Sequence, residues 1–303
     1  MTVRFDGRVA IVTGAGGGLG RLHALGLAAR GAKVVVNDLG GTLDGSGGTP
    51  SAAQAVVDEI RTAGGDAIAS GASVTDFAAV QTMVGEAMQR WGRVDILVNN
   101  AGILRDKSFS KLDIADIELV IQVHLMGTIF CTKAVWPIMM EKKYGRIVVT
   151  TSGSGLTGNF GQSNYGAAKM GVVGLMNTLE HEGARSNIRI NAISPMADTR
   201  MTGAIMDPNV QKYASPDHIA APVAWLSSED CNVSGEIVCA MAGSYTAVRL
   251  YQTETVRFDP ANPATLDQFA EKAPALFDFE KSAQPYAGVM GMISHLPKAE
   301  PAA

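Results

Sequence analysis

The chain has 303 residues, of which 47% are hydrophobic and 18% are charged, and its net charge is -4 at pH 7. This composition supports a full hydrophobic core and excludes a disordered chain. Because the sequence also has no long basic run, we expect no nucleic-acid partner.

We expect neither a membrane span nor a targeting signal. No apolar stretch reaches the roughly 18 uncharged residues that a spanning helix needs. The first residues lack the pattern of a secretion signal and the last three are not the peroxisomal address, so we expect a cytoplasmic location. The cysteines lack metal-ligand spacing, and we expect buried thiols and no metal. They are Cys131, Cys231 and Cys239.

A glycine-rich turn follows the first predicted strand. Residues 8–13 form an apolar run, and the glycines of 14–20 lead into an amphipathic helix over 21–30. Glycines allow close backbone approach to a phosphate, and a helix N-terminus offers unpaired N–H groups. The alternative is a tight packing turn without a ligand. The predicted phosphate-binding residues are Gly14, Gly18, Leu19 and Gly20.

An acidic residue ends the second predicted strand, residues 32–38. Asp38 lies about twenty residues beyond the glycines, where a carboxylate accepts hydrogen bonds from an adenosine ribose and repels a 2′-phosphate. No lysine or arginine occurs at positions 37–43. The pattern therefore favours NAD over NADP, with a turn or helix-capping aspartate as the alternative.

Later strands extend this site. After a glycine-rich loop over 39–50 and a helix over 51–63, we predict strands at 66–73 and 94–99. Cofactors bind at the carboxyl ends of the strands in an open parallel sheet. The residues predicted there are Ser73, Val74, Asn100, Ala101 and Gly102, and Asp76 is predicted to begin the next helix.

The alternation of strands and helices predicts an α/β fold with a doubly wound, parallel, Rossmann-type sheet. We find no boundary before about residue 243. The sequence thus indicates a single domain over residues 1–243 and a C-terminal extension over 244–303.

Tyr165 and Lys169 are four residues apart, a spacing that places both on one face of a helix. A neighbouring ammonium favours the phenolate and lowers the pKa of a phenol from about 10. Tyr165 is therefore a candidate general base or acid. Ser152 ends the apolar run 146–152 and could hydrogen-bond the same substrate oxygen. A chance pair is the alternative, because short motifs are weak evidence alone.

Taken together, these motifs resemble the short-chain dehydrogenase/reductase family. Residues 13–20 and 99–102, then Ser152, Tyr165 and Lys169, follow the family order and spacing, and the resemblance covers about residues 5–243. It implies a nicotinamide cofactor and catalysis by the serine, tyrosine and lysine. It also implies that Lys169 contacts the nicotinamide ribose.

Four segments are similar to the (3R)-hydroxyacyl-CoA dehydrogenases of this family: residues 36–41, 100–106, 158–162 and 193–201. This resemblance implies a (3R)-3-hydroxyacyl-CoA substrate, which could be a steroid side-chain acyl-CoA. One alternative is a 17β-hydroxysteroid dehydrogenase that acts on free steroids. Another is a non-catalytic nucleotide-binding regulator.

The chain departs from the family pattern at two places. His124 stands where most members carry an asparagine of a proton relay. Histidine can pass protons near neutral pH, and the alternative is a structural histidine bonded to a backbone carbonyl. Pro195 and Met196 replace the usual proline-glycine pair, which affects the expected backbone contacts to the nicotinamide amide.

The second half adds a helix whose apolar stripe exceeds one core face, residues 165–179, and the family implies a homodimer or homotetramer through it. We predict a substrate-facing loop over 197–216 and a last strand over 235–241. A capping box at 265–268 predicts a helix through residue 273. We expect the extension to pack on the body or on a partner subunit, where it could shape the substrate mouth.

Overall fold

Short runs of valine, isoleucine and alanine form the strands of a central eight-stranded sheet. The strands are β1 (Val9–Thr13), β2 (Lys33–Asn37), β3 (Ala67–Ser70), β4 (Ile96–Asn99), β5 (Gly145–Thr150), β6 (Ile188–Met196), β7 (Ile237–Met241) and β8 (Ser244–Val248). The computed structural model describes residues 2–42, 44–47, 51–199, 208–280 and 283–286. The chain forms two compact units, Met1–Ala247 and Val248–Ala303.

The strand order is β3-β2-β1-β4-β5-β6-β7-β8. Successive pairs from β3 to β7 are parallel. The chain moves outward from β1 to β3 and then returns to place β4 on the other side of β1. In open parallel sheets, ligands bind outside the carboxyl ends of the strands at such a switch point. The predicted Rossmann-type fold is confirmed.

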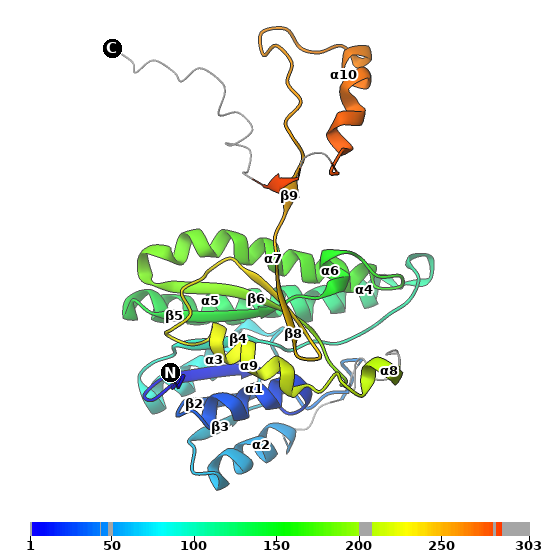
Figure 1. Ribbon diagram of the computed structural model, residues 1–303. Helices are drawn as coiled ribbons and strands as arrows, with labels where there is room; N and C mark the ends of the chain where they lie inside the picture. The colour runs from blue at the N-terminus through cyan, green and yellow to red at the C-terminus, as the bar shows by residue number, and fades with distance from the viewer. Residues whose placement is uncertain (1, 43, 48–50, 200–207, 281–282, 287–303) are drawn as a thin grey trace, which may run out of the picture. The chain divides into compact units, whose positions relative to one another are not determined.

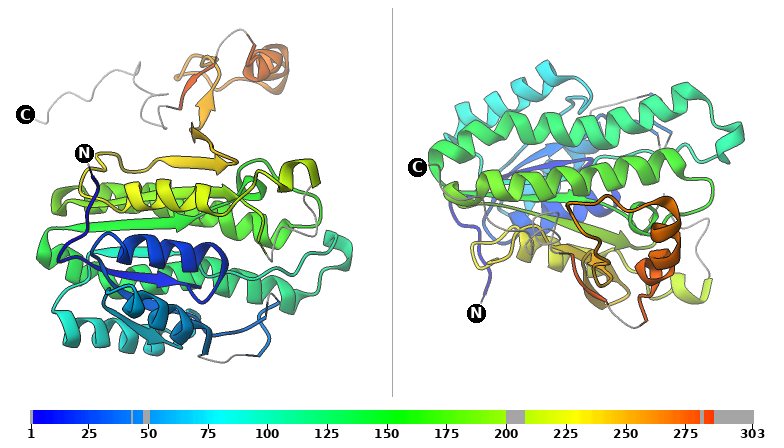
Figure 2. Two further views of the ribbon diagram at one scale, coloured as in Figure 1. Left: turned by 60° about the horizontal axis from the view of Figure 1, so that its bottom comes forward. Right: turned by 90° about the horizontal axis from the view of Figure 1, so that it is seen from above.

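Helices cover both faces of the sheet (Figure 1). Helices α1 (Gly18–Ala28), α2 (Ser51–Thr62) and α9 (Asp217–Leu226) pack together on one face. The other face carries α3 (Phe77–Trp91), α5 (Gly127–Lys142) and α7 (Ser163–Gly183), as the two views of Figure 2 show. The shorter helical elements are η1 (Phe109–Lys111), α4 (Ile114–Ile121), η2 (Gln122–Met126), α6 (Gly153–Leu156), η3 (Ala184–Ser186) and α8 (Pro208–Gln211).

Several predicted boundaries are wrong, among them that of the strand predicted over 66–73, since β3 ends at Ser70. Helix α1 begins at Gly18 and not at Arg21, because the last glycines of the turn already form its first turn. The strand predicted as the last one is followed by β8, since Ala242 and Gly243 turn the chain back with φ angles of 47° and 76°. Two positive φ angles in a two-residue connection are typical of a hairpin. Asp76 caps α3 as predicted, because its carboxylate accepts from Ala78 N and Ala79 N.

The helical stretch Ile114–Lys142 is long and apolar enough to cross a membrane by length and composition alone. Core helices of globular proteins pass the same test. Its second half, α5, packs on β4 and β5 and beside α3. The apolar residues of α5 therefore pack in the helical layer that covers one face of the sheet.

The C-terminal unit contains β9 (Tyr251–Gln252) paired with β10 (Gln284–Pro285), the helix α10 (Leu266–Lys272) and η4 (Ala273–Phe277). Thr265 begins α10 with the predicted capping box, in which its side chain and that of Gln268 bond each other's backbone. None of the described residues from 248 onward is buried. Ring contacts such as that between Phe258 and Phe269 form only a small cluster.

The buried His23 side chain predicts a loss of stability in mild acid. It is 3% exposed on α1, and burial lowers its pKa from 6.5 to about 4. Between these values the unfolded chain binds the proton more readily, so the free energy of unfolding falls as pH falls through this range. The free energy of unfolding of the wild type should therefore be lower at pH 5 than at pH 7.5. We expect His23→Leu to make this difference smaller by roughly 2 kcal/mol.

Urea unfolding at both pH values measures this difference. The exposed His181, replaced in His181→Leu, is the matched control and should leave the difference as in the wild type. An unchanged pH dependence in His23→Leu would contradict the assignment.

Candidate active site

The turn after β1 has no room for side chains. Gly14 has φ +62°, and a Cβ there would lie 2.8 Å from Ala101 Cα. A Cβ on Gly20 would lie 2.1 Å from Gly14 O, so Gly20 lets α1 pack directly on the turn. Helix α1 begins at Gly18 and presents its unpaired N–H groups at the same place. The sequence therefore builds the expected anion-binding turn.

The Asp38 carboxylate lies at the end of β2 and faces this turn. It accepts hydrogen bonds from Gly16 N at 2.7 Å and from Gly40 N at 2.6 Å. A Cβ on Gly16 would lie 2.9 Å from the carboxylate, so this close approach requires glycine. Two backbone donors fix the carboxylate at the wall of the cavity described next.

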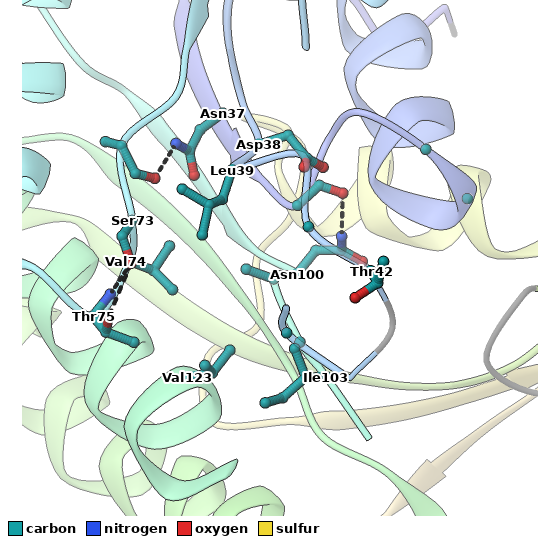
Figure 3. Close-up of a pocket in the computed structure, with 18 of the residues that line it drawn as sticks. Asn37, Asp38, Leu39, Thr42, Ser73, Val74, Thr75, Asn100, Ile103 and Val123 are labelled. Atoms are coloured by element: carbon teal, nitrogen blue, oxygen red, sulfur yellow. Dashed lines mark hydrogen bonds between the residues drawn. The ribbon is translucent and has the colours of Figure 1, made fainter. Parts of the chain in front are cut away.

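A cavity of about 300 Å³ opens at the carboxyl ends of β1 to β4 (Figure 3). Its lining includes nine residues predicted for the cofactor: Gly14, Gly18, Leu19, Asp38, Ser73, Val74, Asn100, Ala101 and Gly102. The other three predicted cofactor residues, Gly20, Tyr165 and Lys169, are not in the lining, and Gly20 lies beneath the turn. No lysine or arginine is among the described residues that line the cavity.

Other lining residues were not singled out from the sequence. Thr42 belongs to the glycine-rich loop, Leu119 and Val123 to the helical stretch after β4, and Thr199 to the segment after β6. Nothing in their local pattern marks them, since each reaches the cavity only through the tertiary fold. The loop predicted over 197–216 includes α8, and its residues 200–207 lie outside the described residues.

Asn100 fastens β4 to the turn after β1. Its backbone N–H donates to Thr13 Oγ1 at 3.0 Å, and its side-chain Nδ2 donates to Thr13 O at 3.0 Å and to Gly14 O at 3.1 Å. The N–H of Ala101 donates to the same threonine hydroxyl at 3.1 Å. These bonds brace β4 against β1.

Tyr165 and Lys169 share one face of α7, as their spacing predicts. The Lys169 Nζ lies 5.5 Å from the centre of the Tyr165 ring and donates to Thr150 O at 2.6 Å. Ser152 follows β5 and caps α6, accepting from Ser154 N at 3.2 Å. Its hydroxyl also lies close enough to the Tyr165 phenol to lower the pKa of that group. The structure thus brings the three predicted catalytic side chains together.

The expected downward pKa shift of the phenol is not found. Burial raises the pKa of Tyr165 above 10, hydrogen bonding to Ser152 opposes this rise, and the charge of Asp106 adds to it. Burial also lowers the pKa of Lys169 from 10.5 to about 7. The prediction that Lys169 lowers the pKa of the Tyr165 phenol is therefore wrong for this arrangement. Burial is the largest influence on the pKa of both groups.

His124 lies in the π-helical segment η2, between the cavity wall and the tyrosine. Its ring packs edge-on against that of Tyr165 at 5.0 Å between centres, and a Cβ on Gly102 would lie 2.3 Å from its Cε1. Its Nε2 lies 2.8 Å from Ile103 O. Burial, then the charge of Lys169, lowers its pKa to about 3, so the ring is neutral at neutral pH. The same Nε2 lies 3.1 Å from Ile103 N, so it bonds the backbone of Ile103 in either tautomer, and the predicted bond to a carbonyl is made when Nε2 carries the hydrogen.

The glycine turn, the strand-end acid and the serine, tyrosine and lysine beside one cavity define a nicotinamide-dependent oxidoreductase. The family model "short chain dehydrogenase" matches residues 8–209. The chain belongs to the short-chain dehydrogenase family.

The chain is 48% identical over 282 residues to the peroxisomal multifunctional enzyme type 2 of Drosophila melanogaster, covering 92% of this chain and 47% of that protein. The solved full-length structure with that name and organism has a TM-score of 0.78 at 40% identity, covering 96% of this chain and 49% of the other. The chain thus spans about half the length of these relatives.

A 7α-hydroxysteroid dehydrogenase solved with NADH and 7-oxo glycochenodeoxycholic acid is also similar. It has a TM-score of 0.72 at 31% identity, covering 79% of this chain and 95% of the other. Its bound NADH and the family membership support a nicotinamide cofactor here.

The close packing at Gly20 generates a test of the cofactor cradle. In Gly20→Ala the new Cβ would meet Gly14 O at 2.1 Å and Asn100 Nδ2 at 2.5 Å, so the turn must move. We expect affinity for NADH to fall at least about tenfold, because the phosphate-binding backbone is displaced. Fluorescence titration with NADH measures this affinity.

Gly26→Ala in the same helix is the matched control, since no heavy atom lies within 4 Å of its added Cβ. It should bind NADH as the wild type does and gain up to about 1 kcal/mol of stability from helix propensity. Equal NADH affinity in both variants would contradict the assigned role of Gly20.

Proposed function

We propose that the protein is an NAD-dependent dehydrogenase that interconverts (3R)-3-hydroxyacyl-CoA and 3-ketoacyl-CoA. The observation that carries this proposal is the grouping of Ser152, Tyr165 and Lys169 next to His124, whose ring contacts Gly102 in the cavity lining. The substrate class is supported by the names of the relatives, among them a peroxisomal hydratase-dehydrogenase-epimerase of Saccharomyces cerevisiae.

In the proposed reaction Tyr165 takes the proton of the substrate hydroxyl as the carbinol becomes a carbonyl. Ser152 hydrogen-bonds the same oxygen and stabilises the charge that develops on it. The bound NAD would accept the hydride from the carbinol carbon. Lys169 would orient the cofactor ribose.

His124 is proposed to pass the proton onward. Because its pKa of about 3 keeps the ring neutral, it would act by accepting a proton on one nitrogen while releasing one from the other. Its Nδ1 has no hydrogen-bond partner among the described residues and is free for this purpose.

The proposed choice of NAD rests on Asp38. Its carboxylate is held at the cavity wall by two backbone amides, where it can bond a ribose diol and would repel a 2′-phosphate. The other proposed cofactor contacts are the cavity-lining residues named above, with Gly20 beneath them and with Tyr165 and Lys169 at the nicotinamide end.

The charge of Asp38 can be tested separately from its shape. Asp38→Asn keeps the size of the side chain and removes the negative charge that excludes a phosphate. We expect the ratio of kcat/KM for NAD to that for NADP to fall at least about tenfold. The reason is that the repulsion between the Asp38 carboxylate and the 2′-phosphate of NADP is removed. Asp76→Asn, at the helix cap of α3, is the matched control and should leave the ratio unchanged. An unaltered ratio in Asp38→Asn would count against the proposed NAD selectivity.

A second candidate is a dehydrogenase of free steroids, including the 17β-hydroxyl. It is supported by the similarity to the 7α-hydroxysteroid dehydrogenase, whose chemistry acts on a ring alcohol. Both candidates need the same serine, tyrosine and lysine, so only the substrate distinguishes them.

We further propose that the extension packs on the body or on a partner subunit of a homodimer or homotetramer. Its large apolar side chains support this, because Leu266 and Phe277 are among its exposed residues and no described residue of the unit is buried. Apolar surface of this extent is normally covered in a folded protein.

The proposed reaction predicts reduced nicotinamide from a (3R)-3-hydroxyacyl-CoA and NAD. We expect kcat/KM for this substrate to exceed that for a free 17β-hydroxysteroid at least about tenfold, because the thioester and acyl chain add binding contacts. Tyr165→Phe should lower kcat by roughly 10²- to 10⁴-fold through loss of the general base while NADH affinity is retained.

Absorbance of NADH at a fixed enzyme concentration follows both reactions. Faster turnover of the free steroid would reverse the order of the two candidates. Wild-type turnover in Tyr165→Phe would exclude the proposed mechanism for both.

A further inference from the structure

Gln162 connects three segments that surround the catalytic side chains. It is the capping residue before α7 and is 7% exposed. Its Nε2 donates to Asp106 Oδ2 at 2.6 Å, and its Oε1 accepts from Ser154 Oγ at 2.6 Å and Asn159 Nδ2 at 3.0 Å. Both lone-pair positions of the amide oxygen are therefore occupied, and the amide nitrogen is bonded to a carboxylate.

Gln162 is linked through Ser154 to the Ser152 hydroxyl and by its main chain to the helix that carries Tyr165. Ser154, which donates its hydroxyl to Gln162, uses its backbone N–H to hold Ser152 Oγ at 3.2 Å. On the other side, Gln162 O accepts from Gly166 N at 2.7 Å in the first turn of the helix that carries Tyr165. Gln162 thus joins the two segments: its side chain bonds the segment of the serine, and its main chain belongs to the start of the helix of the tyrosine.

The partner of Gln162 belongs to a firmly held loop. Asp106 lies between Arg105, whose carbonyl accepts from Asn164 Nδ2 at 3.1 Å, and Lys107, whose N–H donates to Gly161 O at 3.0 Å. The Asp106 side chain is exposed except for this contact. Its carboxylate can therefore act as a fixed acceptor that orients the Gln162 amide.

We propose that Gln162 is a positioning residue that sets the place of the Ser152 hydroxyl relative to the Tyr165 phenol, and that Asp106 holds Gln162 in this orientation. The inference rests on the proposed catalytic roles of Ser152 and Tyr165. None of Asp106, Ser154 and Gln162 lines the cofactor cavity, so their effect on the reaction is separable from cofactor binding.

The charged groups around this contact come from three elements. Tyr165 lies on α7 within reach of the charge of Asp106, and Arg105 and Lys107 flank Asp106 on the loop. Both of these cations form ion pairs with Asp116 of α4. The charge of Asp106 also acts on the phenol directly, which is a second effect that the experiment must separate from orientation.

Two single variants and their combination separate the effects. Gln162→Glu keeps the shape of the side chain and its acceptor for Ser154 but places a carboxylate against that of Asp106. Asp106→Asn removes the charge and keeps an oxygen that can accept from Gln162. The double variant Gln162→Glu with Asp106→Asn restores one donor and one acceptor in the reverse direction and has the net charge of the wild type.

We expect Gln162→Glu to lower kcat by about tenfold or more at pH 8, because small misplacements of reacting groups have effects of this size. The loss should shrink as pH falls, since two facing carboxylates can share a proton and reform the bond. Asp106→Asn should lose less than Gln162→Glu, and the double variant should recover at least half of the lost kcat. NADH affinity should stay at the wild-type value, and the stability that two facing carboxylates cost in Gln162→Glu should return in the double variant.

Rates are measured with NAD and a (3R)-3-hydroxyacyl-CoA from pH 6 to 9, and the exposed Gln81→Glu on α3 is the matched control. Wild-type kcat in Gln162→Glu would overturn the role of Gln162, and a double variant as slow as Gln162→Glu would overturn the role of Asp106. Loss of NADH affinity in Gln162→Glu, or a loss of stability that the double variant does not recover, would also overturn the inference in favour of a general structural role. Wild-type turnover in Tyr165→Phe would instead contradict the proposed function.

Discussion

The fastening of Asn100 to the end of β1 is the contact on which the rest of the site depends. The Asn100 side chain donates to the carbonyls of Thr13 and Gly14, where the hydrogen-bond ladder of β1 stops. At this point the connection after β1 leads to one side of the sheet, to β2, and the connection after β4 leads to the other side, to β5. Buried backbone carbonyls need such partners, and a side-chain amide can supply them without narrowing the crevice. The turn that would hold phosphates is thereby fixed to β4. The segment that follows β4 contacts His124 and Gln162, which lie beside the catalytic side chains.

Burial, more than mutual charge, governs the catalytic groups. It raises the pKa of Tyr165, lowers that of Lys169 to about 7 and lowers that of His124 to about 3, so each group is shifted toward its neutral form. In such a low-dielectric setting, a single added charge interacts strongly with all three. The protonation of the site is therefore set by what binds beside it, and the residue spacing alone cannot specify it.

Much of the cofactor half could be predicted because it follows from chain order. In a parallel sheet the residues after each strand meet at one edge, so Asp38, Ser73 and Asn100 were identifiable from the ends of apolar runs. Tyr165 and Lys169 followed equally from helical spacing. Contacts between distant segments had no local signal, which is why Thr199 and the bond between Asp106 and Gln162 were not anticipated. The pKa of the phenol was mispredicted because spacing does not reveal burial.

The segment after β4 shows why the two halves of the site cannot vary independently. Within seven residues it braces the phosphate turn through Asn100, bonds the His124 ring through Ile103 and reaches Gln162 through Asp106. The pairing of β4 with both β1 and β5 makes this arrangement possible, because one strand end then lies beside both neighbouring loops. A displacement of this segment would move the cofactor turn and the catalytic serine together. Its many backbone hydrogen bonds are therefore expected to matter as much for hydride and proton transfer as for stability.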